Sequence, residues 1–167
     1  MNDIEAIIEI PQGSRNKYEY DHAEHVIRLD RVLHSAVHYP ADYGFLPETL
    51  SLDGDPLDVL VLVYDPTFPG CHVPVRPIGV LRMIDDKGED EKILAVPVGD
   101  PRFDEIHDLE AVRGHWLKEI ENFFATYKLL EEKDTELLGW EDVAAAHKVI
   151  RRAQNLYRDT TRGEEAH

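Results

Sequence analysis

The chain has 167 residues, of which 43% are hydrophobic, a length and composition that fit one folded domain and exclude intrinsic disorder over most of the chain. Its 18 Lys and Arg residues against 34 Asp and Glu residues give a formal net charge of −16 at pH 7. This charge repels the phosphates of nucleic acids and of anionic membranes, so neither is an expected partner, and an anionic substrate would need metal ions beside it.

Short apolar runs alternate with turns rich in Gly, Pro and Asp over the first hundred residues, and they predict strands. No helical pattern of ten residues lies between these runs, which disfavours a doubly wound parallel sheet. So many short strands favour a sandwich or a barrel. The predicted strands are residues 4–10, 17–20, 26–29, 57–63, 73–75, 79–83 and 93–98.

The apolar spacing changes to that of a helix after Asp108, which is the predicted N-cap. Trp116, Ile120 and Phe123 lie on one stripe of this helix. A second helix is predicted from about residue 141 to about residue 157. The predicted fold is therefore an α+β domain, with a β-barrel core and two helices packed on it.

The two ends of the chain and its single cysteine, Cys71, bear on its domain organisation and its expected location in the cell. We expect one domain over residues 1–158 and a flexible C-terminal tail over residues 159–167, which hold no large apolar side chain. One cysteine excludes an internal disulfide and a zinc site of four cysteines. Residues 1–10 lack a charged and then apolar leader, and no apolar run approaches 18 residues, so the expected location is the cytoplasm.

Three carboxylates, Asp53, Asp55 and Asp58, fall within six residues directly before a buried apolar run, in a turn stiffened by Gly54 and Pro56. Two carboxylates about 4 Å apart repel by about 4 kcal/mol at an effective dielectric constant near 20, so the cluster favours a bound cation over a solvated acidic turn. Oxygen ligands select Mg²⁺, Ca²⁺ or Mn²⁺. The spacing does not fit an EF-hand calcium loop, which requires Gly where Asp58 stands.

A second acidic group surrounds Gly88 and contains Asp85 and Asp90, with Lys92 directly after it. Taken alone, this group is typical of a charged hairpin turn. Its place between neighbouring strands would let it face the first group across the opening of a barrel. Carboxylates from two separate turns can together hold several metal ions.

Cationic and phenolic side chains recur near the ends of the predicted elements, among them Lys17, Arg31, Tyr43 and Lys128. Taken alone, a lysine or an arginine is more typical of the surface, and a tyrosine is more typical of the core. A guanidinium, an ammonium and a phenol hydroxyl can nevertheless all donate hydrogen bonds to phosphate oxygens.

Together these motifs resemble the soluble family I inorganic pyrophosphatases in their bacterial form. The resemblance covers about residues 5–157 and rests on motifs that occur in the same order, at residues 8–11, 17–19, 30–31, 39–44, 53–59, 76–79, 85–92 and 123–128. It implies a small closed five-stranded OB-like barrel with two flanking helices and extra hairpins. It also implies hydrolysis of pyrophosphate to two orthophosphates by direct attack of a metal-activated water, with several Mg²⁺ ions for which Mn²⁺ could substitute, in a homohexamer.

The resemblance also implies a role for each matching residue. The implied metal ligands are Glu9, Asp53, Asp58, Asp85 and Asp90. The implied phosphate-binding residues are Lys17, Arg31, Tyr43, Tyr127 and Lys128. The implied supporting residues are Glu19, Tyr39 and Lys92. Asp55 fits the general base, and Asp90 is the competing assignment.

Two alternatives compete with this interpretation. The first is a phosphatase of the haloacid dehalogenase type, because Asp53 and Asp55 follow apolar residues and residues 99–104 imitate the downstream acidic motif of that class. The alternating strands and helices of the haloacid dehalogenase class are not predicted from this sequence. The second is a non-enzymatic module, either an OB-type oligonucleotide binder or a metal-binding protein. The net charge disfavours the oligonucleotide binder, which needs a basic groove.

Overall fold

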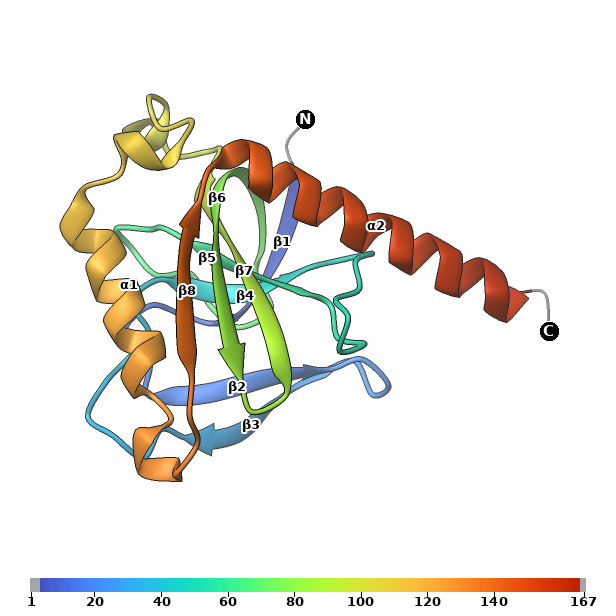
Figure 1. Cartoon of the computed structure of the whole chain (residues 1–167), viewed down its shortest axis with the longest axis horizontal. Helices are drawn as coiled ribbons and strands as arrows, with labels where there is room; N and C mark the ends of the chain where they lie inside the picture. The colour runs from blue at the N-terminus through green and yellow to red at the C-terminus, as the bar shows by residue number, and fades with distance from the viewer. Residues whose placement is uncertain (1–3, 166–167) are drawn as a thin grey trace.

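The computed structural model describes residues 4–165, which form a mixed β-sheet with two α-helices packed on it (Figure 1). Six strands are hydrogen-bonded in the order β1-β4-β5-β7-β6-β8, and a further pairing between β1 and β6 closes a ring of the first five. The bounds are β1 (Ile4–Ile10), β4 (Asp42–Leu46), β5 (Leu57–Val61), β7 (Gly88–Pro97), β6 (His72–Asp85) and β8 (Glu136–Glu141).

Strand β6 closes the ring because its 14 residues are long enough to pair with three neighbours. It runs antiparallel to β7 along most of its length, while its start pairs with β1 and its end pairs with β8. The register with β7 shifts between Pro77 and Gly79. Because Pro and Gly are typical of strand breaks, the sequence predicts two strands here, and the structure has one irregular strand instead.

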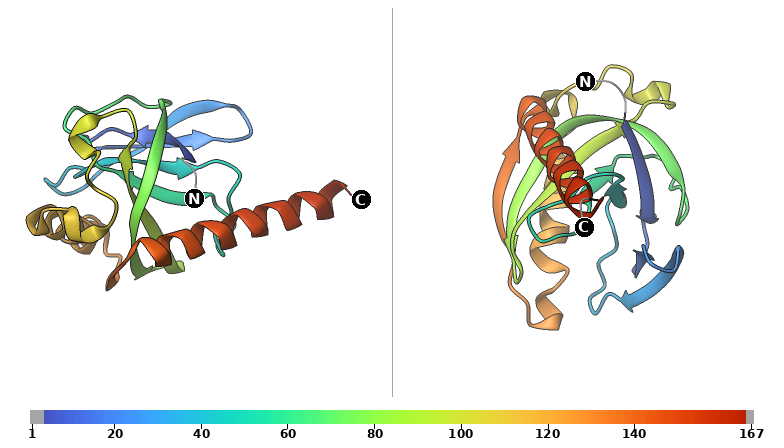
Figure 2. Two further views of the ribbon diagram at one scale, coloured as in Figure 1. Left: turned by 90° about the horizontal axis from the view of Figure 1, so that it is seen from above. Right: turned by 90° about the vertical axis from the view of Figure 1, so that its right-hand side faces the viewer.

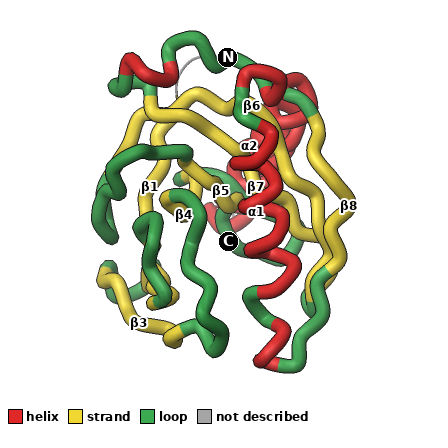
Figure 3. The backbone as a smooth tube through the Cα atoms, turned by 90° about the vertical axis from the view of Figure 1, so that its left-hand side faces the viewer, coloured by secondary structure: helices red, strands yellow, loops and turns green. Residues whose placement is uncertain are grey.

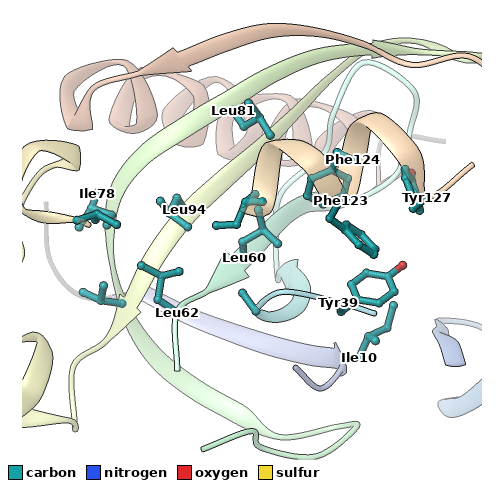
Figure 4. Close-up of a cluster of buried hydrophobic side chains, with 14 of the residues drawn as sticks. Ile10, Tyr39, Leu60, Leu62, Ile78, Leu81, Leu94, Phe123, Phe124 and Tyr127 are labelled. Atoms are coloured by element: carbon teal, nitrogen blue, oxygen red, sulfur yellow. The ribbon is translucent and has the colours of Figure 1, made fainter. Parts of the chain in front are cut away.

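Apart from Asp58, strand β5 is apolar, because it buries both of its faces. Leu60 packs in a cluster with Leu94 and with residues of α1 such as Phe124 (Figure 4). Val59 and Val61 point to the opposite face and pack in a second cluster beneath α2. The strand that carries Asp58 therefore packs between two hydrophobic clusters.

Helix α1 (Gly114–Thr126) begins later than the sequence predicts. Asp108, the predicted N-cap, instead caps a short 3-10 turn by accepting a hydrogen bond from the Leu109 amide at 2.7 Å. The same carboxylate accepts a hydrogen bond from the Val143 amide, the first residue of α2 (Val143–Glu165). Asp108 is a capping residue, as predicted, but it caps the 3-10 turn and the start of α2 instead of the start of α1.

Helix α2 packs on the sheet through its first half only, where Ala146, Val149, Ile150 and Ala153 are buried. Its second half projects beyond the sheet (Figure 2). The helix continues to Glu165, so the predicted tail is helical as far as the described residues reach, and residues 166 and 167 lie outside them. The domain boundary at residue 158 and the flexibility of the tail stay predictions.

Strands β2 (Asn16–Asp21) and β3 (Val26–Val32) form a separate antiparallel hairpin beside the ring (Figures 1 and 3). The predicted fold class, an α+β domain with a closed five-stranded sheet and two helices, is confirmed. Strands β4 and β8 are not predicted from the sequence. Among residues 4–165, neither helix is both long and apolar enough to cross a membrane.

Candidate active site

A cavity of about 190 Å³ lies between the strand ring and the β2–β3 hairpin. Strands from both sheets and the segment after α1 contribute to its lining. Seven carboxylates and four ammonium groups line it: Glu9, Glu19, Asp53, Asp55, Asp58, Asp85 and Asp90, with Lys17, Lys87, Lys92 and Lys128. The two acidic groups of the sequence therefore meet in one place.

Lys92 pairs with two of these carboxylates, and its side chain is only 3% exposed. Its Nζ lies 3.0 Å from Asp58 Oδ2 and 2.8 Å from Asp90 Oδ2, and it donates a hydrogen bond to the Tyr43 hydroxyl at 2.8 Å. The parallel register of β5 and β7 places Asp58 opposite Lys92. Burial alone would lower the pKa of Lys92, but Asp58 and the other acidic groups around it raise that pKa well above its ordinary value, so the ammonium stays charged.

Asp53 and Asp55 are exposed on the turn before β5, at the edge of the cavity. The Asp55 amide donates to Asp53 Oδ1 at 3.0 Å, and the Ser51 amide donates to the Asp55 carbonyl at 2.7 Å. Gly54 between them has a φ of +88°, a left-handed conformation that glycine adopts without strain. The turn thus presents two carboxylates in a defined local geometry beside Asp58.

Asp85 reaches the cavity from the β6–β7 hairpin, which it closes opposite Gly88. Lys128 Nζ lies 3.9 Å from Asp85 Oδ2 and 3.4 Å from Asp86 Oδ1. The same ammonium lies 5.3 Å from the centre of the Tyr127 ring. These contacts join the segment after α1 to the hairpin that carries the second acidic group.

Glu9 reaches the cavity from the end of β1. Its Oε2 accepts a hydrogen bond from the Tyr20 amide at 2.7 Å, which ties β1 to the β2–β3 hairpin. Burial raises the pKa of Glu9 from 4.5 to about 7, and the hydrogen bond from Tyr20 offsets only part of this rise. The negative charge of nearby Asp58 raises the pKa further. A cation beside Glu9 would stabilise its charged form.

The donor chemistry of the cavity fits hard divalent cations, because its carboxylates outnumber its lysines by three. Within residues 4–165, no three Asp, Glu, His or Cys side chains converge on a single point. The carboxylates are spread around the cavity instead. Mg²⁺ keeps several water ligands and needs only one or two carboxylates per ion, so a spread set of oxygens fits several such ions.

Comparison with known proteins decides the family of the chain. Residues 6–158 match the family model described as inorganic pyrophosphatase. The chain belongs to the inorganic pyrophosphatase family. An inorganic pyrophosphatase of Methanosarcina mazei is 58% identical over 151 residues, which cover 90% of this chain and 89% of the relative. One of Geobacillus stearothermophilus is 54% identical over 147 residues, or 88% of this chain and 89% of the relative.

Solved structures of the family have the same fold. The inorganic pyrophosphatase of Thermus thermophilus has a TM-score of 0.92 at 46% identity, covering 94% of this chain and 92% of that one. The Helicobacter pylori enzyme has a TM-score of 0.92 at 41% identity, covering 94% of each chain. The family resemblance read from the sequence is confirmed. The haloacid dehalogenase alternative is wrong, because that class requires strands and helices that alternate around a parallel sheet.

Two of the site residues predicted for this pyrophosphatase chain, Arg31 and Tyr39, do not line the cavity. Arg31 Nε lies 3.0 Å from Glu131 Oε1, outside the cavity lining. Tyr39 is 1% exposed, and its ring centre lies 5.5 Å from that of Tyr43 and 4.6 Å from that of Phe123. Tyr39 thus packs against Tyr43 from the core side. The roles implied for both residues by the family resemblance stay predictions.

The other predicted phosphate-binding and supporting residues do line the cavity. Lys17 extends from β2 and pairs with Asp30 of β3 at 2.9 Å. Burial raises the pKa of Tyr127 to about 12, so its hydroxyl keeps its proton and can donate to a phosphate oxygen. Glu19, also on β2, lies near Lys17 on the same side of the hairpin.

Four polar side chains of the lining, Tyr18, Tyr20, His22 and Lys87, are not among the site residues predicted from the sequence. The His22 ring lies edge-on to Tyr20, with ring centres 4.8 Å apart, and edge-on to Phe45 at 5.1 Å. No periodic pattern singles out His22, because it follows the end of β2 in a turn. Lys87 could have been found, since it lies inside the second acidic group that the sequence analysis considers.

The pKa of Glu9 predicts a pH dependence of stability in the metal-free protein. A carboxyl whose pKa is about 7 when folded and 4.5 when unfolded stabilises the fold below pH 4.5, and this contribution is lost as the pH rises through 7. Raising the pH from 5.5 to 8 in the presence of a chelator should therefore lower the free energy of unfolding of the wild type by about 2 kcal/mol more than that of Glu9→Gln.

Urea unfolding of both proteins at the two pH values measures this difference. Glu24→Gln removes an exposed carboxyl of the hairpin turn and is the matched control, which should follow the wild type. If the free energies of unfolding of the wild type and of Glu9→Gln changed by the same amount between the two pH values, the buried carboxyl of Glu9 would not be the cause of the pH dependence.

Proposed function

We propose that this chain hydrolyses inorganic pyrophosphate to two orthophosphates with the help of Mg²⁺ ions. Membership of the inorganic pyrophosphatase family supports the reaction. The observation that carries the site assignment is the meeting of seven carboxylates and four lysines in one cavity. Pyrophosphate is an anion and the cavity has a surplus of negative charge, so the two are compatible only with cations between them.

The residues that would hold the cations are the acidic ones at the cavity: Glu9, Asp53, Asp58, Asp85 and Asp90. When bound, Mg²⁺ lowers the pKa of coordinated water and neutralises phosphate oxygens. Lys92 keeps two of these carboxylates, Asp58 and Asp90, within 3.0 Å of its ammonium, so that their oxygens stay on the same side of β5 and β7. This arrangement favours ligands that are already oriented before a cation arrives.

Asp55 is the proposed general base that accepts a proton from the attacking water. Its exposed carboxylate stands at the cavity edge on a turn whose backbone is held by three hydrogen bonds. Asp90 is the competing assignment, but the Lys92 ammonium lies 2.8 Å from its Oδ2 and occupies an oxygen that a general base would need for the attacking water. We therefore favour Asp55.

The proposed role of the cationic and phenolic side chains is to bind the phosphate oxygens. Lys17, Lys128 and the Tyr43 and Tyr127 hydroxyls line the cavity from three separate segments. Donors placed on several sides of a phosphate stabilise the charge that shifts to the leaving oxygen during in-line displacement. Arg31, which lies beside Lys17 in the β2–β3 ladder, is proposed to join them.

Phosphate release from pyrophosphate tests this function. The purified protein should release two phosphates per pyrophosphate with Mg²⁺, for which Mn²⁺ could substitute, and should lose this activity in excess chelator. An aryl phosphate monoester is the control substrate and should not be hydrolysed at a comparable rate. Activity that persists in chelator, or a preference for the monoester, would contradict the proposal.

We also propose that the chain forms a homo-oligomer, which the family resemblance implies to be a hexamer in the cytoplasm. Exposed large apolar side chains support self-association, among them Tyr64 and Phe68 on the loop between β5 and β6, which are 57% and 63% exposed. A second copy that covers this loop would remove them from water.

A further inference from the structure

An ion pair between Arg31 and Glu131 joins the end of β3 to the turn that follows α1. Arg31 Nε lies 3.0 Å from Glu131 Oε1. The Glu131 side chain is only 6% exposed, although it belongs to a short 3-10 turn at the protein surface, and that of Arg31 is 25% exposed. Asp30 Oδ2, at 3.6 Å from Arg31 Nη1, is a second and more distant carboxylate partner.

This ion pair leaves hydrogen-bonding capacity unused. The second carboxylate oxygen of Glu131, Oε2, is buried and has no hydrogen-bond partner among residues 4–165. Arg31 Nε is also without a well-aligned hydrogen bond, despite its short distance to Oε1. A buried ion pair contributes little net stability, because the cost of removing both groups from water offsets their attraction, so stabilisation of the fold is a weak reason for Glu131 to lie beside Arg31.

The pair lies between two cations of the candidate active site. On one side, Arg31 is opposite Lys17 in the β2–β3 ladder, and Lys17 lines the cavity. On the other side, Glu131 follows Lys128 by three residues in the same turn, and Lys128 also lines the cavity. The contact therefore sets the separation of two chain segments that both carry proposed phosphate-binding groups.

We infer that Glu131 is a positioning residue that orients the Arg31 guanidinium for pyrophosphate, an inference that rests on the proposed function. A guanidinium is planar and its five N–H donors have fixed directions. Glu131 faces the Nε edge of this plane at 3.0 Å, and the terminal nitrogens, one of which lies 3.6 Å from Asp30 Oδ2, are the ones that can meet phosphate oxygens. Without Glu131 the long Arg31 side chain samples more rotamers, and binding must then order it.

Glu131→Gln tests this role, because it keeps the size of the side chain and removes its charge. Arg31 would bind the substrate before and during the reaction, so its disorder should raise KM about tenfold and leave kcat within about twofold of the wild type. Glu131→Asp, which keeps the charge on a shorter side chain, should restore part of the affinity. Glu132→Gln makes the same charge change at the exposed neighbouring position and should leave KM unchanged.

The double variant Arg31→Lys/Glu131→Gln separates positioning from general stabilisation. If Glu131 acts through Arg31, the double variant should have the KM of Arg31→Lys alone. Additive effects on KM, or a fall in thermal stability that accounts for the lost activity, would overturn the inference. A normal KM for Glu131→Gln beside a raised KM for Arg31→Lys would overturn it and leave the proposed function standing. A normal KM for both would remove Arg31 from the proposed site as well.

Discussion

Replacing Asp58 by Asn will lower kcat for pyrophosphate hydrolysis on the order of a thousandfold while the protein stays folded. Asp58 stands at the start of β5 and is one of the proposed metal ligands, with its Oδ2 3.0 Å from Lys92 Nζ. Asn keeps the size of the side chain but removes the negative charge that attracts a divalent cation. The fold is spared because the Asn carbonyl can still accept from Lys92, and Asp90 still pairs with that ammonium.

Steady-state phosphate release at saturating Mg²⁺ measures the loss, and thermal unfolding of the same samples measures the fold. Asp65→Asn makes the same change at an exposed loop position and should keep the wild-type kcat. A kcat for Asp58→Asn within about tenfold of the wild type would remove Asp58 from the metal site.

Gly44→Ala will destabilise the folded protein by at least about 4 kcal/mol, because its site has no room for a methyl group. Gly44 in β4 lies opposite Ile8 of β1 and Val59 of β5. A Cβ atom there would overlap the carbonyl oxygen of Ile7 and lie 2.9 Å from Ile8 Cα. These are backbone atoms of a paired strand, so they can make room only if β1 separates from β4.

Urea unfolding measures this change in the free energy of unfolding. Gly99→Ala is the matched control, because a Cβ at that position meets no atom within 4 Å. It should unfold within about 1 kcal/mol of the wild type. If Gly44→Ala were as stable as Gly99→Ala, the close approach of β1 and β4 at Gly44 would be wrong.

The strands and acidic turns of the site could be predicted from the sequence because their determinants are local. Asp53, Asp55 and Asp58 directly precede an apolar run that predicts a buried strand, and Gly54 supplies the left-handed turn residue between them. The structure begins β5 at Leu57 and lines the cavity with all three carboxylates. The order and spacing of residues along the chain are sufficient to predict this strand and the acidic turn before it.

Strands β4 and β8 were not predicted because neighbouring strands stabilise them more than their own residue preferences do. The β4 segment DYGFL contains an Asp and a Gly, residue types that are depleted in strands. Its hydrogen bonds come from β1 and β5, whose sequences lie before and after it in the chain. The β8 segment ELLGWE also contains a Gly and pairs with β6, which lies about fifty residues earlier.

Residue type and order by themselves determined the family, the closed α+β fold and the acidic groups of the site. Only the tertiary structure decided which charges meet: Lys92 lies buried between Asp58 and Asp90, and Arg31 lies against Glu131 outside the cavity. The physical reason is that burial and ion pairing depend on side chains brought together by strand register across long stretches of chain. A pattern read along one segment contains no information on the charge that will face it.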